Sequence, residues 1–528
     1  MAKRKRQSAA PSEPEASSTN PSSASASARS TGFAHLQIIT GTYEKTLHGF
    51  IASIPLSAPT SSSTSSISLS TNFTDTFLFN AHTAPLRTIS ISPPAANSTK
   101  RILATSSADE RVNLYTLSTT LPPLTNSLLK PLSGRNKNLG TLHHHLNTPT
   151  ALVFTPNRAK LLSAGADGQI NILRTRDWNL LSTLKAPKPK PKPLNYAKDY
   201  GEGYGPRIDT FGTEGYGGGA GAINDIALHP SQKILLSVAT KERSVRMWNL
   251  MTGRKAGVLV FGKDVVPREF GSEGLRIEWN KEGSEYAIAF DRGIVVFGMD
   301  SKPRSHPAPL PRSRIHQMRY ATLPRHLFPS ASSSPEEEIE VLITATEDGR
   351  ILFHSLTPDA TLNPSDPLTT PILGVLGGRT LGMPGRVKDF TLLELESQDK
   401  TRKIYVVTGG SDGVVRVWDL CGSGSDEVEV SEANPTAPAK VKGDDGEEKR
   451  RKKVKVDDAM ELDEEEGEKK KKGEVKQVGR LVGMYETARR ITCLTGMVMV
   501  EGGPEDEDEE VEEAEEMSEE ESSDEESE

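Results

Sequence analysis

The sequence is poor in the features that mark disulfide-stabilised, membrane-spanning or secreted proteins. It has only two cysteines, Cys421 and Cys493, which are too few for a disulfide framework and favour a reducing compartment. No apolar run approaches the ~20 residues that a membrane helix needs. The N-terminus reads MAKRKRQ followed by a Ser-, Ala- and Pro-rich tract, and it lacks the apolar core of a secretory signal. We therefore expect an intracellular protein with no membrane segment.

Motifs of catalytic, nucleotide-binding and metal sites are missing as well. GYGGGAG at residues 215–221 lacks the GxxxxGK(S/T) order of a phosphate loop, and no helical pattern follows it. There is no GxSxG, HExxH or paired-carboxylate constellation. His143, His144 and His145 have no cysteine or acid cluster at ligand spacing, and neighbours on a strand would point to opposite faces. The sequence therefore predicts no catalytic residues, no cofactor and no metal.

Charge is unevenly distributed along the chain. The formal net charge is −8, yet residues 501–528 carry 18 acids and no base, so residues 1–500 hold all 64 basic residues against 54 acids. The body is basic and the tail is acidic. Residues 1–32 are rich in Ser, Ala and Pro and cannot bury enough apolar surface to offset the entropy of ordering. We expect both of these terminal segments to be disordered.

The sequence does contain a repeated hairpin pattern. In IYVVTGGSDGVVRVWDL, residues 404–420, two runs with strand chemistry flank a Ser-Asp-Gly turn, and the acid lies six positions before an aromatic residue. The same offset recurs seven times, and five of the second partners are aromatic. The pairs are Glu44 and Phe50, Asp109 and Tyr115, Asp167 and Leu173, Glu242 and Trp248, Asp291 and Phe297, Asp348 and His354, and Asp412 and Trp418. Because these acids occupy turns, we expect them to cap the turns through side-chain to backbone bonds rather than to act in catalysis.

Two histidines share a position within their units. His82 and His145 each lie seven residues before the last apolar residue of the strand core that leads into a hairpin, and both strands end in proline. The shared offset favours structural histidines that are bonded within their own repeats.

The repeat resembles the WD-repeat family, whose GH and WD dipeptides bracket a unit of strands. The match is clearest at Trp418 with Asp419, and Asn249 follows Trp248 at the corresponding place in an earlier unit. The resemblance implies an all-β fold, a seven-bladed β-propeller in which each repeat supplies most of one four-stranded blade.

The two ends of the repeat region complement each other. The first hairpin has no leading strand, and residues 480–500 read as two strands without a hairpin. We predict that residues 491–500 form the inner strand of the first blade and residues 480–486 the outer strand of the seventh, which closes the ring and removes exposed edges. The predicted organisation is a disordered tail at 1–32, a propeller at 33–500 with low-complexity insertions at 185–222 and 421–478, and an acidic disordered tail at 501–528.

A basic run lies in the second insertion. Six of the eight residues in KRRKKVKV, residues 449–456, are basic. These six are Lys449, Arg450, Arg451, Lys452, Lys453 and Lys455. Such a run suits a nuclear import signal and a nucleic-acid contact alike. We favour import, because a second basic run lies at the N-terminus, and this predicts a protein of the nucleus and nucleolus.

Several longer stretches resemble one WD-repeat group, the maintenance-of-killer and PAK-interacting proteins of large ribosomal subunit assembly. They include IITGTYEKTLHGF, HTAPLRTISIS, ILATSSADERVNLY, LHPSQKILLSVATKERSVRMWNL and the RITCL strand. The likeness is good over about residues 33–300 and looser over residues 314–500. It implies a non-catalytic scaffold on pre-60S particles that is needed for rRNA processing and that contacts an assembly factor resembling a large-subunit ribosomal protein. Animal proteins of this group are described as negative regulators of a p21-activated kinase.

Three functions from different classes remain open on the sequence. A ribosome-assembly scaffold predicts co-sedimentation with pre-60S particles, with salt-dependent attraction of the basic body to rRNA. A signalling adaptor that inhibits a protein kinase predicts cytoplasmic partners and normal rRNA in its absence. A histone- or chromatin-binding propeller predicts that loss of residues 501–528 abolishes nuclear binding. In each case we expect a monomer within a larger complex, with partners held by loops at the rims of the propeller.

Overall fold

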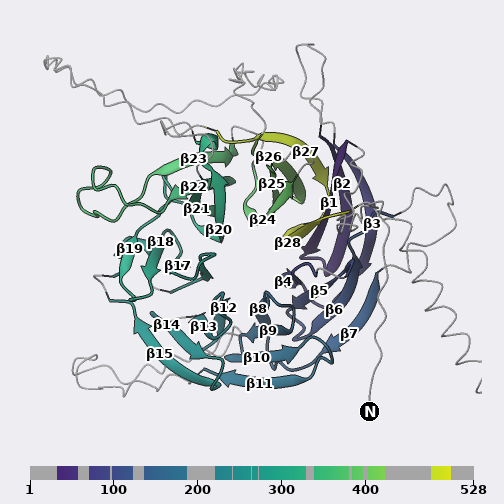
Figure 1. Cartoon of the computed structure of the whole chain (residues 1–528), viewed down its shortest axis with the longest axis horizontal. Coiled ribbons are helices and arrows are strands. Elements are labelled where there is room, and N and C mark those ends of the chain that lie inside the picture. The colour runs from purple at the N-terminus through teal and green to yellow at the C-terminus, as the bar shows by residue number, and fades with distance from the viewer. Residues whose placement is uncertain are drawn as a thin grey trace, which may run out of the picture.

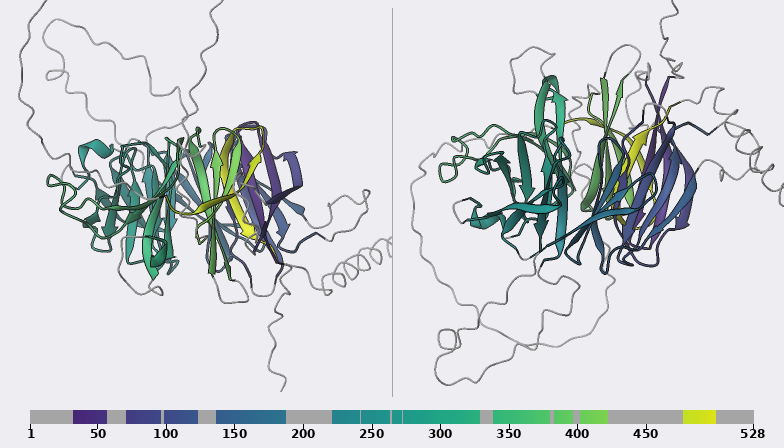
Figure 2. Two further views of the ribbon diagram at one scale, coloured as in Figure 1. Left: turned by 90° about the horizontal axis from the view of Figure 1, so that it is seen from above. Right: turned by 60° about the horizontal axis from the view of Figure 1, so that its bottom comes forward.

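The chain folds into a ring of seven blades. The computed structural model describes residues 32–56, 71–95, 98–122, 136–186, 221–240, 242–262, 265–271, 273–328, 338–379, 383–396, 402–421 and 477–500. Over these residues seven four-stranded antiparallel sheets surround a central channel (Figure 1). Seen from the side, the ring is a flat disc whose strands run between two rims (Figure 2). The predicted all-β, seven-bladed propeller is therefore confirmed.

In the first three blades the strands are ordered from the channel to the perimeter as follows. Blade 1 contains β28 (Ile491–Val498), β1 (Phe33–Thr42), β2 (Thr46–Pro55) and β3 (Asn72–Asn80). Blade 2 contains β4 (Leu86–Ile91), β5 (Lys100–Ser107), β6 (Val112–Ser118) and β7 (Lys137–Leu142). Blade 3 contains β8 (Pro149–Phe154), β9 (Lys160–Gly165), β10 (Gln169–Arg174) and β11 (Leu180–Lys185).

The other four blades follow the same order. Blade 4 contains β12 (Ile223–Leu228), β13 (Ile234–Ala239), β14 (Ser244–Asn249) and β15 (Arg254–Val260). Blade 5 contains β16 (Arg276–Trp279), β17 (Glu285–Ala289), β18 (Ile294–Gly298) and β19 (Pro303–Ser305). Blade 6 contains β20 (Ile315–Pro324), β21 (Glu338–Thr346), β22 (Arg350–Ser355) and β23 (Ile372–Gly377). Blade 7 contains β24 (Val387–Glu396), β25 (Arg402–Gly410), β26 (Val414–Asp419) and β27 (Arg480–Glu486).

Helical structure is confined, within the described residues, to short 3-10 turns such as η2 (Arg268–Phe270) and η3 (Arg325–Leu327). No helix in the described part of the chain is long and apolar enough to span a membrane.

The ring is closed by the last strand of the sequence. β28 pairs antiparallel with β1, in a register that runs from Leu36 opposite Val498 to Thr42 opposite Ile491. β27 pairs with β26 and becomes the outermost strand of blade 7. Both strands take the places predicted for them, so the first blade is built from the two ends of the repeat region. This closure gives every blade four strands and pairs β1 and β26 on both sides.

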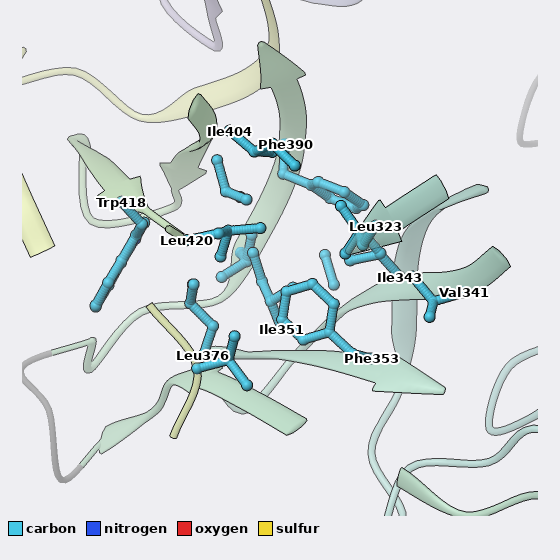
Figure 3. Packing of buried hydrophobic residues seen from close by; sticks show 14 of the residues in the cluster. Leu323, Val341, Ile343, Ile351, Phe353, Leu376, Phe390, Ile404, Trp418 and Leu420 are labelled. Atoms are coloured by element: carbon cyan, nitrogen blue, oxygen red, sulfur yellow. The ribbon is translucent and has the colours of Figure 1, made fainter. Parts of the chain in front are cut away.

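Apolar cores lie between the blades. Among the described residues there are seven clusters of buried apolar side chains, and each lies at one of the seven interfaces between neighbouring blades. Figure 3 shows the interface of blades 6 and 7, where Phe353 of β22, Phe390 of β24 and Trp418 of β26 pack together. Middle strands are rich in Val, Ile and Leu because both of their faces meet a neighbouring blade. Each blade is therefore stabilised by both neighbours.

The outer strands were the part that the sequence did not reveal. The repeat pattern predicts β27 but none of the other perimeter strands, which are β3, β7, β11, β15, β19 and β23. Their side chains alternate weakly, because the outward face meets solvent; in β7, for example, no side chain is fully buried. The predicted tails and most of the two predicted insertions lie outside the described residues.

Candidate functional site

The turns that carry the seven repeated acids lie on one rim of the disc, which we call the hairpin rim. Each turn lies beside the start of an inner strand; in blade 1 the backbone N–H of Tyr43 donates to the carbonyl of Arg490 at 2.9 Å, and equivalent bonds occur in other blades. In the blade 7 turn Gly413 has a φ of +81°, and a Cβ there would lie 2.8 Å from the Arg489 carbonyl oxygen. The seven turns therefore surround one mouth of the channel.

In blade 2 the turn is tied to a buried histidine. His82 Nδ1 lies 3.1 Å from a carboxylate oxygen of Asp109, and its Nε2 lies 2.9 Å from Thr105 Oγ1. The same carboxylate accepts the backbone N–H groups of Thr83 at 3.1 Å and Arg111 at 3.2 Å. Burial alone raises the pKa of Asp109, but the Thr83 N–H, the charge of His82 and the Arg111 N–H outweigh it and lower the pKa overall. An ionised carboxylate thus joins the turn to the start of its blade.

Blade 3 repeats this arrangement with a serine. His145 lies 3.1 Å from Asp167 through Nδ1 and 2.9 Å from Ser163 Oγ through Nε2. Ser, His and Asp in this order have the hydrogen bonds of a hydrolase triad. However, Ser163 is 1% exposed, and so is the His145 side chain, so a substrate atom has no access to the hydroxyl. The arrangement acts as a structural tie within the repeat.

The remaining acids on the rim contact arginine or solvent. Glu242 pairs with Arg246 (2.5 Å), Asp291 with Arg314 (2.9 Å), Asp348 with Arg350 (2.5 Å) and Asp412 with Arg416 (2.9 Å). Glu44 is exposed. Bonds from turn N–H groups to the carboxylates occur at Asp109, Asp167, Asp348 and Asp412. At the other three turns the described contacts include no such bond: Glu242 and Asp291 bind arginine side chains, and Glu44 is exposed.

The second partners of the seven pairs lie inside the blades. The buried residues are Phe50, Tyr115, Leu173, Trp248, Phe297, His354 and Trp418. Trp248 Nε1 donates to Ser237 Oγ at 2.9 Å, and Asp419 accepts the N–H of Cys421 at 3.0 Å. The two partners that are not Phe, Tyr or Trp, namely Leu173 and His354, are as buried as the others, and burial lowers the pKa of His354 to about 3. Burial rather than aromaticity is therefore what the position requires.

Charged side chains line the channel beneath the rim. A cavity of about 830 Å³ has Asp225 of β12, Glu278 of β16 and Asp389 of β24 on its wall. Arg319 Nη1 of β20 lies 3.7 Å from Glu278 Oε1. Burial raises the pKa of Glu278 to about 7; the charge of Arg319 opposes this rise, and the charge of Asp225 adds to it. The wall also carries Arg276 and Lys281, so the middle of the channel is lined by charges of both signs.

Protonation of Glu278 is expected to affect stability. The carboxyl pKa is raised in the folded chain from 4.5 to about 7, so the folded state holds a proton that the unfolded state has released, and stability falls as the pH rises through this window. Glu278→Gln is expected to make that fall shallower than in the wild type, whereas Glu486→Gln, at an exposed position of β27, leaves it unchanged. Thermal unfolding followed by circular dichroism across the window measures both. Identical pH profiles for wild type and Glu278→Gln would contradict the raised pKa.

One assumption about the histidines is wrong, and the prediction about the basic run stays untested. His143 and His144 follow β7, which ends at Leu142, so they do not lie on a strand as the sequence argument assumed. Within the described ranges no group of three or more His, Cys, Asp or Glu side chains is arranged to hold a metal. The import candidates Lys449, Arg450, Arg451, Lys452, Lys453 and Lys455 lie between residues 422 and 476, outside the described residues.

Sequence reasoning missed a set of cations at the mouth of the channel. They come from different blades. Arg87, Arg276 and Lys388, for example, are far apart in the chain but line the same cavity. A signal was present: Arg-Ile-His at residues 314–316, Arg-Val-Lys at 386–388 and Arg-Ile-Thr at 490–492 each lie at the start of an inner strand.

Comparison with known proteins agrees with this architecture. The model of the WD domain, G-beta repeat, matches residues 136–173 and 397–419. The chain is 24% identical to the p21-activated protein kinase-interacting protein 1-like protein of Gallus gallus over 385 residues, 73% of each chain. It is 26% identical to the protein of the same name from Danio rerio over 226 residues, 43% of this chain and 44% of the relative. It is 23% identical to Protein MAK11 of Saccharomyces cerevisiae over 409 residues, 73% of this chain and 78% of the relative.

Seven blades, hairpins tied by buried polar networks and matching repeat models define a WD-repeat β-propeller protein. Within that class, the chain is similar to the p21-activated protein kinase-interacting protein 1-like proteins and to Protein MAK11.

Proposed function

We propose that this chain is a non-catalytic scaffold in large (60S) ribosomal subunit assembly and rRNA processing, binding pre-ribosomal assembly factors. The observation that carries the proposal is the similarity to MAK11 over 73% of the chain, together with the sequence motifs that resemble ribosome-assembly propellers. The partner we propose is an assembly factor that resembles a large-subunit ribosomal protein, with rRNA as an additional contact. The site of action that follows from this proposal is the nucleolus.

The fold supports a scaffold of this kind. A closed ring pairs its own edges, so its rims can hold partners without reorganising. The triad-like network of blade 3 is sealed from solvent and serves the fold. The described residues therefore offer surfaces for recognition, and the hairpin rim and the channel mouth both carry charged side chains.

A second function is favoured by the names of two relatives. The chicken and zebrafish proteins are named as interacting with a p21-activated protein kinase. An adaptor that restrains such a kinase would also use the rims, and it predicts normal ribosomal RNA when the chain is removed.

Depletion of the chain, followed by sucrose-gradient profiling, separates the two functions. The scaffold predicts a selective loss of 60S subunits relative to 40S subunits, rescue by the full chain, and nucleolar location of a tagged copy. The matched control is depletion rescued by a chain that lacks only residues 501–528, which also tests the chromatin-binding alternative. A normal subunit ratio together with raised kinase activity would favour the adaptor and rule out the scaffold.

A further inference from the structure

One residue of every inner strand projects into the mouth of the channel on the hairpin rim. In β4, Leu86 and Thr88 pair with consecutive residues of β5, which leaves Arg87 as a bulge outside the ladder. Equivalent bulges occur in β8, β12, β20, β24 and β28, and Arg276 takes the corresponding place at the start of β16. The seven residues all line one cavity of about 450 Å³, the channel mouth: Arg87, Thr150, Asn224, Arg276, His316, Lys388 and Thr492.

The charged residues that line the channel mouth are all cationic. They are Arg87, Arg276, Arg314, Lys388 and Arg490, and none of the carboxylates in the described part of the chain lines the cavity. Their charges are only partly compensated: Arg314 pairs with Asp291 at 2.9 Å, Arg276 Nε donates to the His316 carbonyl at 3.3 Å, and Arg490 lies 5.6 Å from the ring centre of Tyr43. No described carboxylate lies within ion-pair distance of Arg87, Lys388 or Arg490.

The like charges act on one another. Burial, together with the nearby charges of Lys388, Arg314, Arg386 and Arg276, lowers the pKa of His316 to about 4. Burial also lowers the pKa of Lys388, and the charges of Arg386 and Arg490 add to this. An anion in the channel mouth would relieve this repulsion, so the site is electrostatically prepared for negative charge.

The arrangement of the cations limits the shape of the ligand. They come from five consecutive blades, namely 5, 6, 7, 1 and 2, and so converge from an arc around the mouth. A strand of nucleic acid that crosses the mouth meets only part of that arc, and its bases need flat aromatic surfaces. The aromatic rings on the wall are Tyr43, which is already covered by Arg490, and the imidazole of His316. A compact anion with charge on several sides meets all five blades.

The charges on the wall below the mouth limit how deeply an anion binds in the channel. Arg276 is shared by the channel mouth and the larger cavity beneath it, and that cavity is lined by three acids, Asp225, Glu278 and Asp389, as well as by Arg276, Lys281 and Arg319. The acids offset the cations there, so an anion is attracted more strongly at the mouth than below it. A volume of about 450 Å³ is within the range of small-ligand pockets.

We propose that the channel mouth binds a compact, soluble anion carrying several phosphate groups, held by Arg87, Arg276 and Lys388 at its base and by Arg314 and Arg490 at its rim. Guanidinium groups donate paired hydrogen bonds to phosphate oxygens, and the ammonium of Lys388 acts as a point charge. This inference does not rest on the ribosomal role, and it holds whether or not depletion affects 60S subunits.

Isothermal titration of the full chain with inositol hexakisphosphate and with inorganic tripolyphosphate tests the proposal. We expect one site per chain, with an affinity that weakens as salt is raised. Arg87→Gln combined with Lys388→Gln is expected to weaken binding roughly a hundredfold, at about tenfold for each charge-assisted contact. Arg254→Gln combined with Lys255→Gln makes the same change of charge at exposed positions of the outer strand β15, and is expected to bind as the wild type does.

Two further titrations test whether the phosphate groups belong to a phosphorylated peptide or to RNA. A peptide with several phosphoserines and a single-stranded RNA oligonucleotide are titrated against the same three proteins, and circular dichroism confirms that each variant is folded. Tighter binding of either ligand than of both polyphosphates, with the same loss in the Arg87 and Lys388 variant, would overturn the assignment to a compact soluble anion. Polyphosphate binding that is absent, or equal in all three proteins, would overturn the site itself.

Discussion

A chain that ends at Gln477 is expected to lose the cooperative thermal unfolding of the full molecule, whereas a chain that ends at Val500 is expected to keep it. The first truncation removes β27 and β28; the second removes only residues 501–528. β28 places side chains in two interfaces, Ile491 and Leu494 between blades 7 and 1, and Cys493 and Met497 between blades 1 and 2. All four are at most 4% exposed.

The expected cost of this truncation is comparable with the whole stability of a domain. Four buried side chains at about 1.5 to 3 kcal/mol each amount to roughly 6 to 12 kcal/mol, against about 5 to 15 kcal/mol for a typical folded protein. The cut also exposes the inner edge of β1 and the outer edge of β26, which favours aggregation. Differential scanning calorimetry and gel filtration of the two truncated chains measure the effect. A soluble monomer ending at Gln477 with the melting temperature of the full chain would show that ring closure does not stabilise the fold.

Ring closure was predictable because the repeat pattern lacks a strand at one end and has extra strands at the other. A hairpin at Glu44 without a leading strand and a strand pair after residue 480 without a hairpin require each other once each unit is a four-stranded sheet. The middle strands were equally visible, since Val406 and Val417 lie in runs whose two faces are both buried. Periodicity carries this information because burial on both faces demands apolar residues at every position.

The candidate binding site was not predictable from the same pattern. The channel mouth is formed by bulged residues, and a bulge is set by the pairing of two strands rather than by the local sequence of one. Arg87 and Lys388 are separated by four other blades along the chain and come together only when the ring closes. Each looks like an ordinary surface cation in its own segment. The shared Arg-Ile or Arg-Val dipeptides at the starts of β20, β24 and β28 carry a signal only after the units are aligned by their hairpins.

The histidine networks lie between these extremes. Their shared offset identified His82 and His145 in the sequence. Whether such a network is structural or catalytic depends on how deeply its side chains are buried, and the sequence does not show this. Ser163 is a potential nucleophile in the sequence and an inaccessible hydroxyl in the fold. What the sequence lacks is any measure of which side of a strand a neighbouring blade will cover.

The acids of these networks supply a direct test of that distinction. Asp109→Ala and Asp167→Ala are each expected to destabilise the propeller by about 2 to 4 kcal/mol, because each removes a charged acceptor from turn N–H groups and leaves a buried imidazole nitrogen without a partner. Glu44→Ala changes the equivalent acid of blade 1, which is exposed, and is expected to stay within about 0.5 kcal/mol of the wild type. Asp109→Asn keeps one acceptor oxygen and should fall between these values.

Melting temperatures and resistance to limited proteolysis of the four variants measure the prediction. A drop of about 5 °C is expected for Asp109→Ala and Asp167→Ala, and little change for Glu44→Ala. Because the three alanine variants lose the same charge at the same repeat position, net charge and turn location cannot account for a difference among them. If all three melted together, the buried histidine bonds of blades 2 and 3 would contribute nothing measurable, and the repeated acid would be a turn preference shared by all seven blades.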